Sequence, residues 1–228
     1  MSIELQHVSK QFGSQKALND ISFSVNAGEI AGFIGPNGAG KSTTMKIICG
    51  LLHPDEGNVF INRKNITENS AETRRLLGYL PETNPLYPEM YVMEYLLYVA
   101  GLYQLGKNSK KRIKEITNTT GLEAEKNKKI GALSKGYRQR VGIAQTLLHD
   151  PTVLILDEPT SGLDPNQILE IRNLIKEIGR NKTILLSTHI MQEVEAICDK
   201  VIIINKGEIV ADSNTRHLQN TEKEKFQT

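Results

Sequence analysis

The stretch Gly35-Pro36-Asn37-Gly38-Ala39-Gly40-Lys41-Ser42, followed by Thr43, is a complete G-x-x-x-x-G-K-S phosphate-binding loop. The apolar run 29–34 before it predicts a short buried strand, and the segment 43–50 after it predicts a helix. Glycines let the backbone curl so that its N–H groups point at phosphate oxygens, and the following helix adds its positive end. Lys41 can reach the β- and γ-phosphates, and the Ser42 hydroxyl can ligate Mg²⁺. The stretch therefore predicts a site for a nucleoside triphosphate with Mg²⁺.

The composition limits the other possibilities. A length of 228 residues suits one α/β domain, or one domain with an insertion, and a formal net charge of +2 is too small to indicate nucleic-acid binding. Two cysteines, Cys49 and Cys198, provide neither a disulfide framework nor metal-ligand spacing. The N-terminus has no signal-peptide pattern, and no apolar run reaches the length of a membrane span. We therefore expect a cytoplasmic protein whose role at a membrane would require a partner.

The chain reads as one α/β core interrupted by a helical insertion. Ile21, Phe23 and Val25 alternate with polar residues as in a half-buried strand, and further strands are expected at 58–61 and 75–80. Helical spacing at 90–104 and 109–120 marks an insertion, and the α/β pattern resumes at residue 153 with strands 153–156, 183–187 and 201–204 and helices 165–180 and 190–197. The expected division is a core of residues 1–82 and 150–220, an inserted subdomain of residues 83–149, and a polar tail of residues 221–228.

Two acidic residues follow a buried strand. Val153-Leu154-Ile155-Leu156 is apolar and ends in Asp157 and Glu158. At the carboxyl end of such a strand, Asp157 can hold Mg²⁺ beside the phosphate loop. Glu158 then lies where it could polarise a water molecule for attack on the γ-phosphate. The pair predicts hydrolysis as well as binding.

The order of the remaining motifs resembles a known family. Leu133-Ser134-Lys135-Gly136-Tyr137-Arg138-Gln139-Arg140 precedes the acidic strand, Ser161-Gly162-Leu163-Asp164 follows it, and His189 ends the next strand. Over residues 2–215 this arrangement is similar to the nucleotide-binding subunit of ATP-binding-cassette (ABC) transporters. The resemblance implies a P-loop NTPase (RecA-like) α/β core with an N-terminal antiparallel β subdomain and an inserted α-helical subdomain. It also implies an ATPase that uses ATP and Mg²⁺.

The resemblance assigns further site residues. Phe12 matches the aromatic residue that stacks on adenine, although by itself it reads equally well as a packed core residue. His189 matches the histidine that contacts the γ-phosphate, and Asp164 matches a residue of the loop that crosses the dimer interface. Ser134 and Gly136 match the signature residues that touch the γ-phosphate of the nucleotide held by the partner copy.

Two positions depart from the family pattern. Lys135 and Tyr137 replace the third and fifth residues of the usual Leu-Ser-Gly-Gly-Gln signature. Glu82 stands where the family usually has a glutamine that links Mg²⁺ to the membrane partner. A carboxylate can still ligate Mg²⁺, so we expect the metal role of Glu82 to persist.

The resemblance also implies partners. We expect a head-to-tail pair of two copies with two ATP molecules between them, because the signature segment lies on the insertion and cannot easily reach its own phosphate loop. We further expect a separate integral membrane permease, docked near residues 82–91 and its aromatic stretch, with the chain on the inner face of the cell membrane. The signature variant resembles bacterial ABC-2 type subunits for multidrug export and gliding motility, so the transporter is predicted to be an exporter.

Two alternatives stay open on the sequence. A soluble ABC-type ATPase acting on the ribosome or on nucleic acid would usually carry two cassettes or a coiled coil, and this chain shows neither. The lysine clusters at 107–114 and 126–129 read more readily as a solvated helical face, since no aromatic residues interleave them. A GTPase is suggested by Asn205-Lys206-Gly207-Glu208, but the alternation after it predicts a hairpin turn instead.

Overall fold

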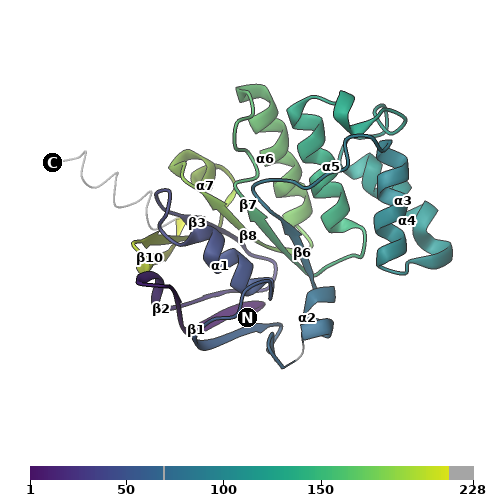
Figure 1. Cartoon of the computed structure of the whole chain (residues 1–228). Coiled ribbons are helices and arrows are strands. Elements are labelled where there is room, and N and C mark those ends of the chain that lie inside the picture. Colours follow the sequence, from purple (N-terminus) through teal and green to yellow (C-terminus); the bar gives the residue numbers. More distant parts are fainter. Residues whose placement is uncertain (69, 216–228) are drawn as a thin grey trace.

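The computed structural model describes residues 1–68 and 70–215, which form two β-sheets and a set of helices (Figure 1). The larger sheet has the order β10-β9-β3-β8-β7-β6 and the smaller has the order β2-β1-β4-β5. The larger sheet consists of β3 (Ile30–Ile34), β6 (Leu77–Leu80), β7 (Val153–Asp157), β8 (Thr183–Thr188), β9 (Lys200–Asn205) and β10 (Glu208–Asn214). All its pairings are parallel except that of β10 with β9. The predicted α/β class is confirmed.

The smaller sheet is the antiparallel N-terminal unit at the bottom of Figure 1. It comprises β1 (Ile3–Phe12), β2 (Gln15–Val25), β4 (Glu56–Ile61) and β5 (Lys64–Asn65). The inward positions of β2, among them Ile21, Phe23 and Val25, are buried as their alternation predicts. Register shifts interrupt β1 after Leu5, where His7 has a φ of 53°. A bulge of this kind breaks the two-residue period, and β1 therefore carries a weaker sequence pattern than β2.

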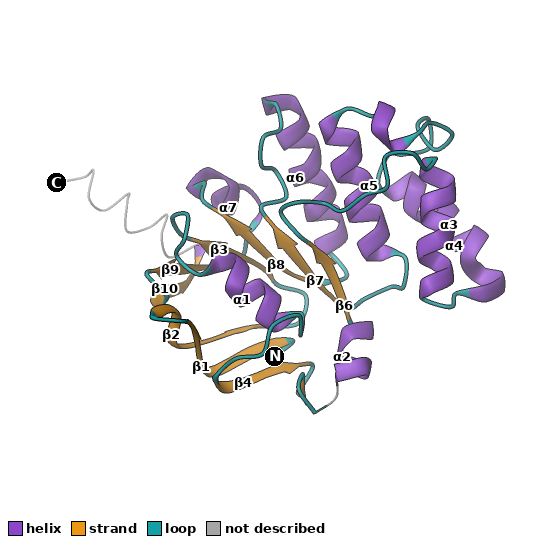
Figure 2. Ribbon diagram, in the orientation of Figure 1, coloured by secondary structure: helices purple, strands orange, loops and turns teal. Residues whose placement is uncertain are grey.

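The central strands of the larger sheet, β3, β7 and β8, are buried on both faces, which explains their largely apolar sequences. Along β7, Val153 and Ile155 pack with the antiparallel sheet and helix α1 (Lys41–Ile48), whereas Leu154 and Leu156 pack with the helices on the opposite face. Helix α1 thus lies between the two sheets (Figure 2). The opposite face is covered by α5 (Lys135–Leu147), α6 (Pro165–Gly179) and α7 (Met191–Ile197).

The segment between β6 and β7 is helical, as predicted. It contains α3 (Val92–Leu102), α4 (Ser109–Thr119) and α5, with short 3-10 turns at Gly106–Asn108 and Ile130–Ala132. Helices α3 and α4 lie at the outer edge of the molecule, beyond α5 (Figure 1). Their buried side chains, such as Leu96 and Ile113, belong to the same core cluster as Leu156 of the sheet. The exact limits 83 and 149 stay a prediction.

One segment differs from the sequence expectation. The strand predicted at 75–80 begins only at Leu77, and Ser70–Arg75 forms helix α2. This helix is short and polar, with Thr73 buried, so it carries no apolar period that would have indicated a helix. The predicted polar tail, residues 221–228, lies outside the described residues. None of the described helices is long and apolar enough to cross a membrane.

Candidate nucleotide-binding site

A cavity of about 440 Å³ opens at the carboxyl ends of the parallel strands. Ligands of open α/β sheets bind at this edge, because the loops that leave neighbouring strands converge there. The lining contains most of the predicted site residues, drawn from segments far apart in the sequence. It is formed by Phe12, Gln15, Ala17, Asn37, Gly38, Gly40, Lys41, Ser42, Thr43, Glu82, Glu158, Ser161 and His189.

The phosphate loop runs from β3 into α1 as its sequence predicts. Gly38 and Gly40 have φ values of 77° and 111°, a backbone region that glycine enters without steric cost. A Cβ on Gly35 would lie 2.3 Å from the carbonyl oxygen of Ile204, so the loop can pass close to β9 only with glycine there. The buried Lys41 ammonium donates to the carbonyl oxygen of Gly35 at 2.7 Å. The backbone of the loop therefore helps to position its own lysine.

Glu158 is the centre of the charged groups in the cavity. It is 8 % exposed, with one carboxylate oxygen 3.4 Å from Nζ of Lys41 and the other 3.0 Å from Nδ1 of His189. Its φ of 48° is a left-handed conformation that is unusual for a residue other than glycine. Strained backbone of this kind is typical of functional sites. Lys41 begins α1, whereas Glu158 and His189 directly follow β7 and β8, so the fold brings together three side chains that lie far apart in the sequence.

Asp157 ends β7 and is almost completely buried. Ser187, its register partner on β8, donates to its Oδ1 at 2.6 Å and accepts from the backbone N–H of Glu158 at 2.9 Å. Sequence reasoning missed Ser187, although the switch from apolar to hydroxyl residues at the end of β8 was a visible signal. Ser42 lines the cavity, whereas Asp157 lies behind the lining; the hydroxyl and the carboxylate are both hard oxygen ligands of the kind that Mg²⁺ prefers. The donor set thus fits a magnesium ion that also binds phosphate.

Phe12 and Glu82 line the same cavity, and they come from the two different sheets. Phe12 is at the end of β1 and 48 % exposed, which rules out the alternative reading as a core residue. The ammonium of Lys10 lies 5.6 Å from the centre of its ring. Glu82 is exposed and follows β6. Gln15, Ala17 and Ser161 also line the cavity, and no motif in the sequence marked the first two.

Ser134, Gly136 and Asp164 are not among the residues that line this cavity. Ser134 caps α5 by accepting from the backbone N–H of Tyr137, and Asp164 caps α6 by accepting from that of Gln167. Both caps are exposed, whereas Gly136 is buried against the side chain of Gln167. One chain therefore presents the signature residues on a surface apart from its own phosphate loop.

The segments behind the alternative readings have ordinary structural roles. Lys126, Lys128 and Lys129 each pair with a glutamate, which lowers the positive charge of that surface. Asn205 pairs with Glu208 across the β9–β10 hairpin, and Lys206 and Gly207 both have positive φ, as in a type I′ turn. The hairpin prediction for this segment is confirmed, and it accounts for the Asn-Lys pair without a guanine site.

The fold and this cavity define a P-loop nucleoside-triphosphatase. A family model described as ABC transporter matches residues 18–161. The chain is 40 % identical over 219 residues to the bacitracin transport ATP-binding protein BcrA of Bacillus licheniformis, covering 95 % of this chain and 71 % of BcrA. It is 36 % identical to the Nod factor export ATP-binding protein I of Burkholderia lata, covering 96 % of this chain and 73 % of that protein.

A solved dimeric ATP-binding cassette bound to ADP and Pi superposes with a TM-score of 0.83 at 27 % identity, covering 94 % of this chain and 99 % of that one. The chain thus belongs to the ABC transporter family. It is an ATP-binding subunit that hydrolyses ATP to power a membrane permease. The family resemblance found in the sequence is confirmed.

Proposed function

We propose that this subunit drives an exporter whose permease is a separate protein, and that it acts on the inner face of the cell membrane. Two similar proteins named for bacitracin transport and for Nod factor export support this direction. The observation that carries the mechanism is the separation of two sets of residues. Lys41, Glu158 and His189 share one cavity, whereas Ser134 and Gly136 lie outside it.

That separation favours a head-to-tail pair. The start of α5 presents backbone N–H groups and the exposed Ser134 hydroxyl, a suitable site for a phosphate. A second copy would bring these groups over the γ-phosphate in the cavity of the first, with Asp164 at the interface. Each site would then be completed by the other copy, so ATP would join the two chains and its hydrolysis would release them. A similar cassette is dimeric in its complex with ADP and Pi.

Within each cavity, the chain's own groups have distinct tasks in this proposal. The phosphate-loop N–H groups and Lys41 hold the triphosphate, and Phe12 stacks on the adenine. Ser42, Asp157 and Glu82 hold Mg²⁺, which would supply neutralisation of phosphate charge. Glu158 accepts a proton from the attacking water, and His189, 3.0 Å from Glu158, orients that carboxylate and contacts the γ-phosphate.

The test is Glu158→Gln, which removes the base but keeps the phosphate-binding groups. Turnover should fall by about 10²–10⁴-fold, while ATP binding persists. With hydrolysis blocked, a dimer should accumulate in Mg-ATP on size exclusion and dissociate in ADP. Adding Ser134→Arg should abolish that dimer, because the larger side chain obstructs the partner's γ-phosphate.

Ser109→Arg, the same change at the start of α4, serves as the control and should leave the dimer intact. Melting temperatures check that the loss of the Ser134 cap, worth about 1 kcal/mol, has not unfolded the chain. Unchanged turnover in Glu158→Gln would show that the base is another group. A dimer that survives Ser134→Arg would contradict the head-to-tail arrangement.

We also propose that the permease docks in a tyrosine-lined groove between β6 and the inserted subdomain, which shares Tyr87 with the predicted segment 82–91. The groove has a volume of about 390 Å³ and contains five of the seven tyrosines of the chain. Its lining comprises Tyr79, Tyr87, Tyr95, Tyr98, Val99, Leu102, Tyr103, Gln145 and Thr146. Tyrosine is enriched where proteins bind one another, because it supplies a large rigid contact with a polar end.

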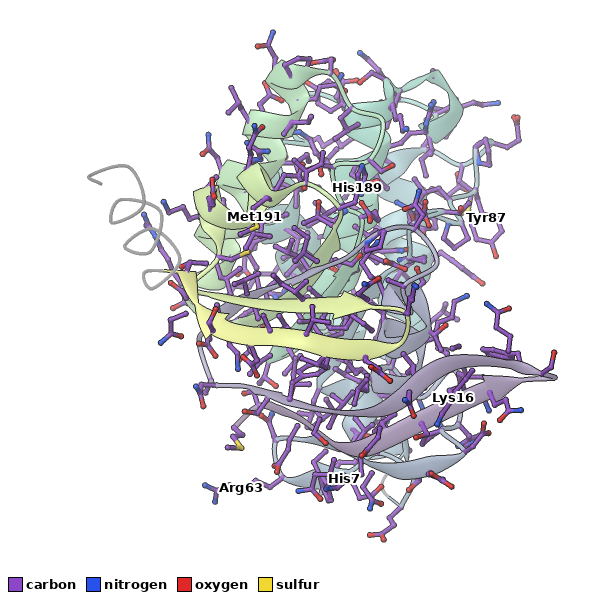
Figure 3. All side chains as sticks on the ribbon, turned by 90° about the vertical axis from the view of Figure 1, so that its left-hand side faces the viewer. His7, Lys16, Arg63, Tyr87, His189 and Met191 are labelled. Carbon is purple, nitrogen blue, oxygen red and sulfur yellow. The ribbon has the colours of Figure 1, made fainter. Side chains whose placement is uncertain are left out.

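The groove is ready to form hydrogen bonds. The hydroxyl of Tyr79 is buried and has no partner within the described chain, and a buried hydroxyl without a partner is costly. The hydroxyl of Tyr95 donates to Oε1 of Gln145 inside the groove, and burial raises its pKa to about 12. Tyr87 and Tyr98 are about half exposed at the rim. In Figure 3, Tyr87 projects from the edge of the molecule.

A further inference from the structure

A buried carboxylate in α7 has no part in the mechanism above. Glu193 is 1 % exposed, although it carries a charge. Its Oε1 accepts from the Thr160 hydroxyl at 2.6 Å, and its Oε2 accepts from the Thr188 hydroxyl at 2.7 Å. The guanidinium of Arg172, on α6, lies 3.6 Å from Oε1. Each carboxylate oxygen is therefore bound by a different segment of the chain.

The two segments are those that carry the groups of the catalytic site. Thr160 follows Glu158 by two residues, in the loop that leads to Ser161 and Asp164. Thr188 is the last residue of β8 and directly precedes His189. The Thr188 hydroxyl also accepts from the backbone N–H of Ile190 at 3.1 Å, which fixes the chain on the far side of His189. Glu193 thus joins the loop after Glu158 to the strand end before His189.

Stability by itself does not explain a carboxylate at this place. Desolvating a charge costs several kcal/mol, and buried ion pairs are often no more stabilising than apolar groups of similar volume. A carboxylate fixes the positions of its partners more firmly than a neutral group does, because hydrogen bonds to a charged acceptor are shorter and roughly twice as strong as neutral ones. Two such bonds, one from each segment, hold the segments at a fixed separation.

We propose that Glu193 is a positioning residue for ATP hydrolysis. Its carboxylate holds the 158–164 loop against the end of β8, which sets the 3.0 Å contact between Glu158 and His189. Through the same loop it also sets the place of Ser161, in the cavity, and of Asp164, at the proposed interface. A displacement of about 1 Å between reacting groups can cost about 100-fold in rate. The inference rests on the proposed roles of Glu158 and His189.

The test removes each hydrogen bond without changing the shape of the core. Thr160→Val and Thr188→Val are nearly isosteric and leave the carboxylate in place. We expect the turnover number to fall by about 10- to 100-fold in each, with the KM for ATP changed less than about twofold, because Lys41 and the phosphate loop are untouched. Glu193→Gln, which keeps one acceptor oxygen, should retain more turnover than Glu193→Ala.

Thr120→Val is the matched control. Thr120 is fully buried and donates its hydroxyl to the carbonyl oxygen of Ile116 at 2.7 Å, in the insertion. It should lower the melting temperature as much as the test variants while leaving turnover unchanged. If Thr160→Val and Thr188→Val keep wild-type turnover and only melt earlier, Glu193 has a structural role alone and the proposal is wrong.

Glu158→Gln, assayed in parallel, separates this failure from that of the proposed function. Retained turnover in Glu158→Gln overturns the assignment of the base, whatever the threonine variants do. Lost turnover in Glu158→Gln together with wild-type turnover in both threonine variants overturns the role of Glu193 only.

Discussion

Two hollows in the described part of the chain, the nucleotide cavity and the tyrosine-lined groove, are of similar size but opposite chemistry. The nucleotide cavity, about 440 Å³, gathers a lysine, two glutamates and a histidine around a loop of backbone N–H groups. The groove of about 390 Å³ is lined by five tyrosines, three aliphatic or hydroxyl-bearing neighbours and one glutamine, without a charged side chain. Charged groups fixed in a concave site suit a phosphate and its hydrolysis, whereas rigid aromatic rings suit another protein. The two functions of a transport ATPase can therefore be disrupted separately.

The largest effect is expected from Lys41→Ala. The Lys41 ammonium lies in the cavity, where the proposal places the β- and γ-phosphates, and it also compensates Glu158, 3.4 Å away. Without it, ATP should bind more weakly by about 3 kcal/mol or more, since charged hydrogen bonds are worth about 1.5–3 kcal/mol each. A titration with fluorescent ATP measures this loss. Permease binding without nucleotide should be unaffected.

Lys46→Ala provides the control, because Lys46 is exposed on the same helix. Wild-type affinity for ATP in Lys41→Ala, at physiological Mg²⁺, would contradict the assignment of the phosphate loop.

Tyr87→Ala and Tyr98→Ala should weaken permease binding and leave ATP binding unaffected. Their rings meet edge to face with centroids 6.0 Å apart, and both are about half exposed. Loss of either ring should weaken permease binding by about 2–4 kcal/mol, the range of interface hot spots. Basal ATPase of the isolated chain should persist. Co-purification with the permease and transport in vesicles are the measurements.

Tyr87→Phe keeps the ring and should bind almost normally. Tyr91 lies in the predicted docking segment 82–91 but does not line the groove. Tyr91→Ala therefore distinguishes docking on that segment, which it should weaken, from docking in the groove, which it should leave intact. Intact complexes and full transport in both groove variants would place the docking surface elsewhere.

The smallest effect is expected from Phe12→Ala. A base stacked on an aromatic ring is worth about 1–3 kcal/mol, and ATP and GTP should both weaken, because stacking does not read the edges of the base. The melting temperature should hardly change, since Phe12 is half exposed. Phe12→Tyr keeps the stacking face and should bind like wild type. Unchanged affinity for both nucleotides would contradict the stacking role of Phe12.

The sequence predicted the parts of the fold that have a strong local period. The buried strands Val153–Asp157 and Thr183–Thr188 and the helix Pro165–Gly179 lie within a residue or two of their predicted limits. It missed helix α2, which is short and mostly polar, and the bulge at His7 weakened the pattern of β1. Propensity and period report only on a residue's neighbours in the chain, so short or irregular elements carry little signal.

The phosphate loop is what the sequence determined by itself, because its eight contiguous residues form the binding surface through their own backbone. The tertiary structure decided the rest of the site. Lys41, Glu158 and His189 meet because β3, β8 and β7 are neighbours in the sheet, an order that the chain does not follow. The same strand order brings the Ser187 hydroxyl within hydrogen-bond distance of Asp157. The packing of α7 places the Glu193 carboxylate between the hydroxyls of Thr160 and Thr188. A hydrogen bond depends on distance in space, and only the packed sheet brings these side chains within that distance.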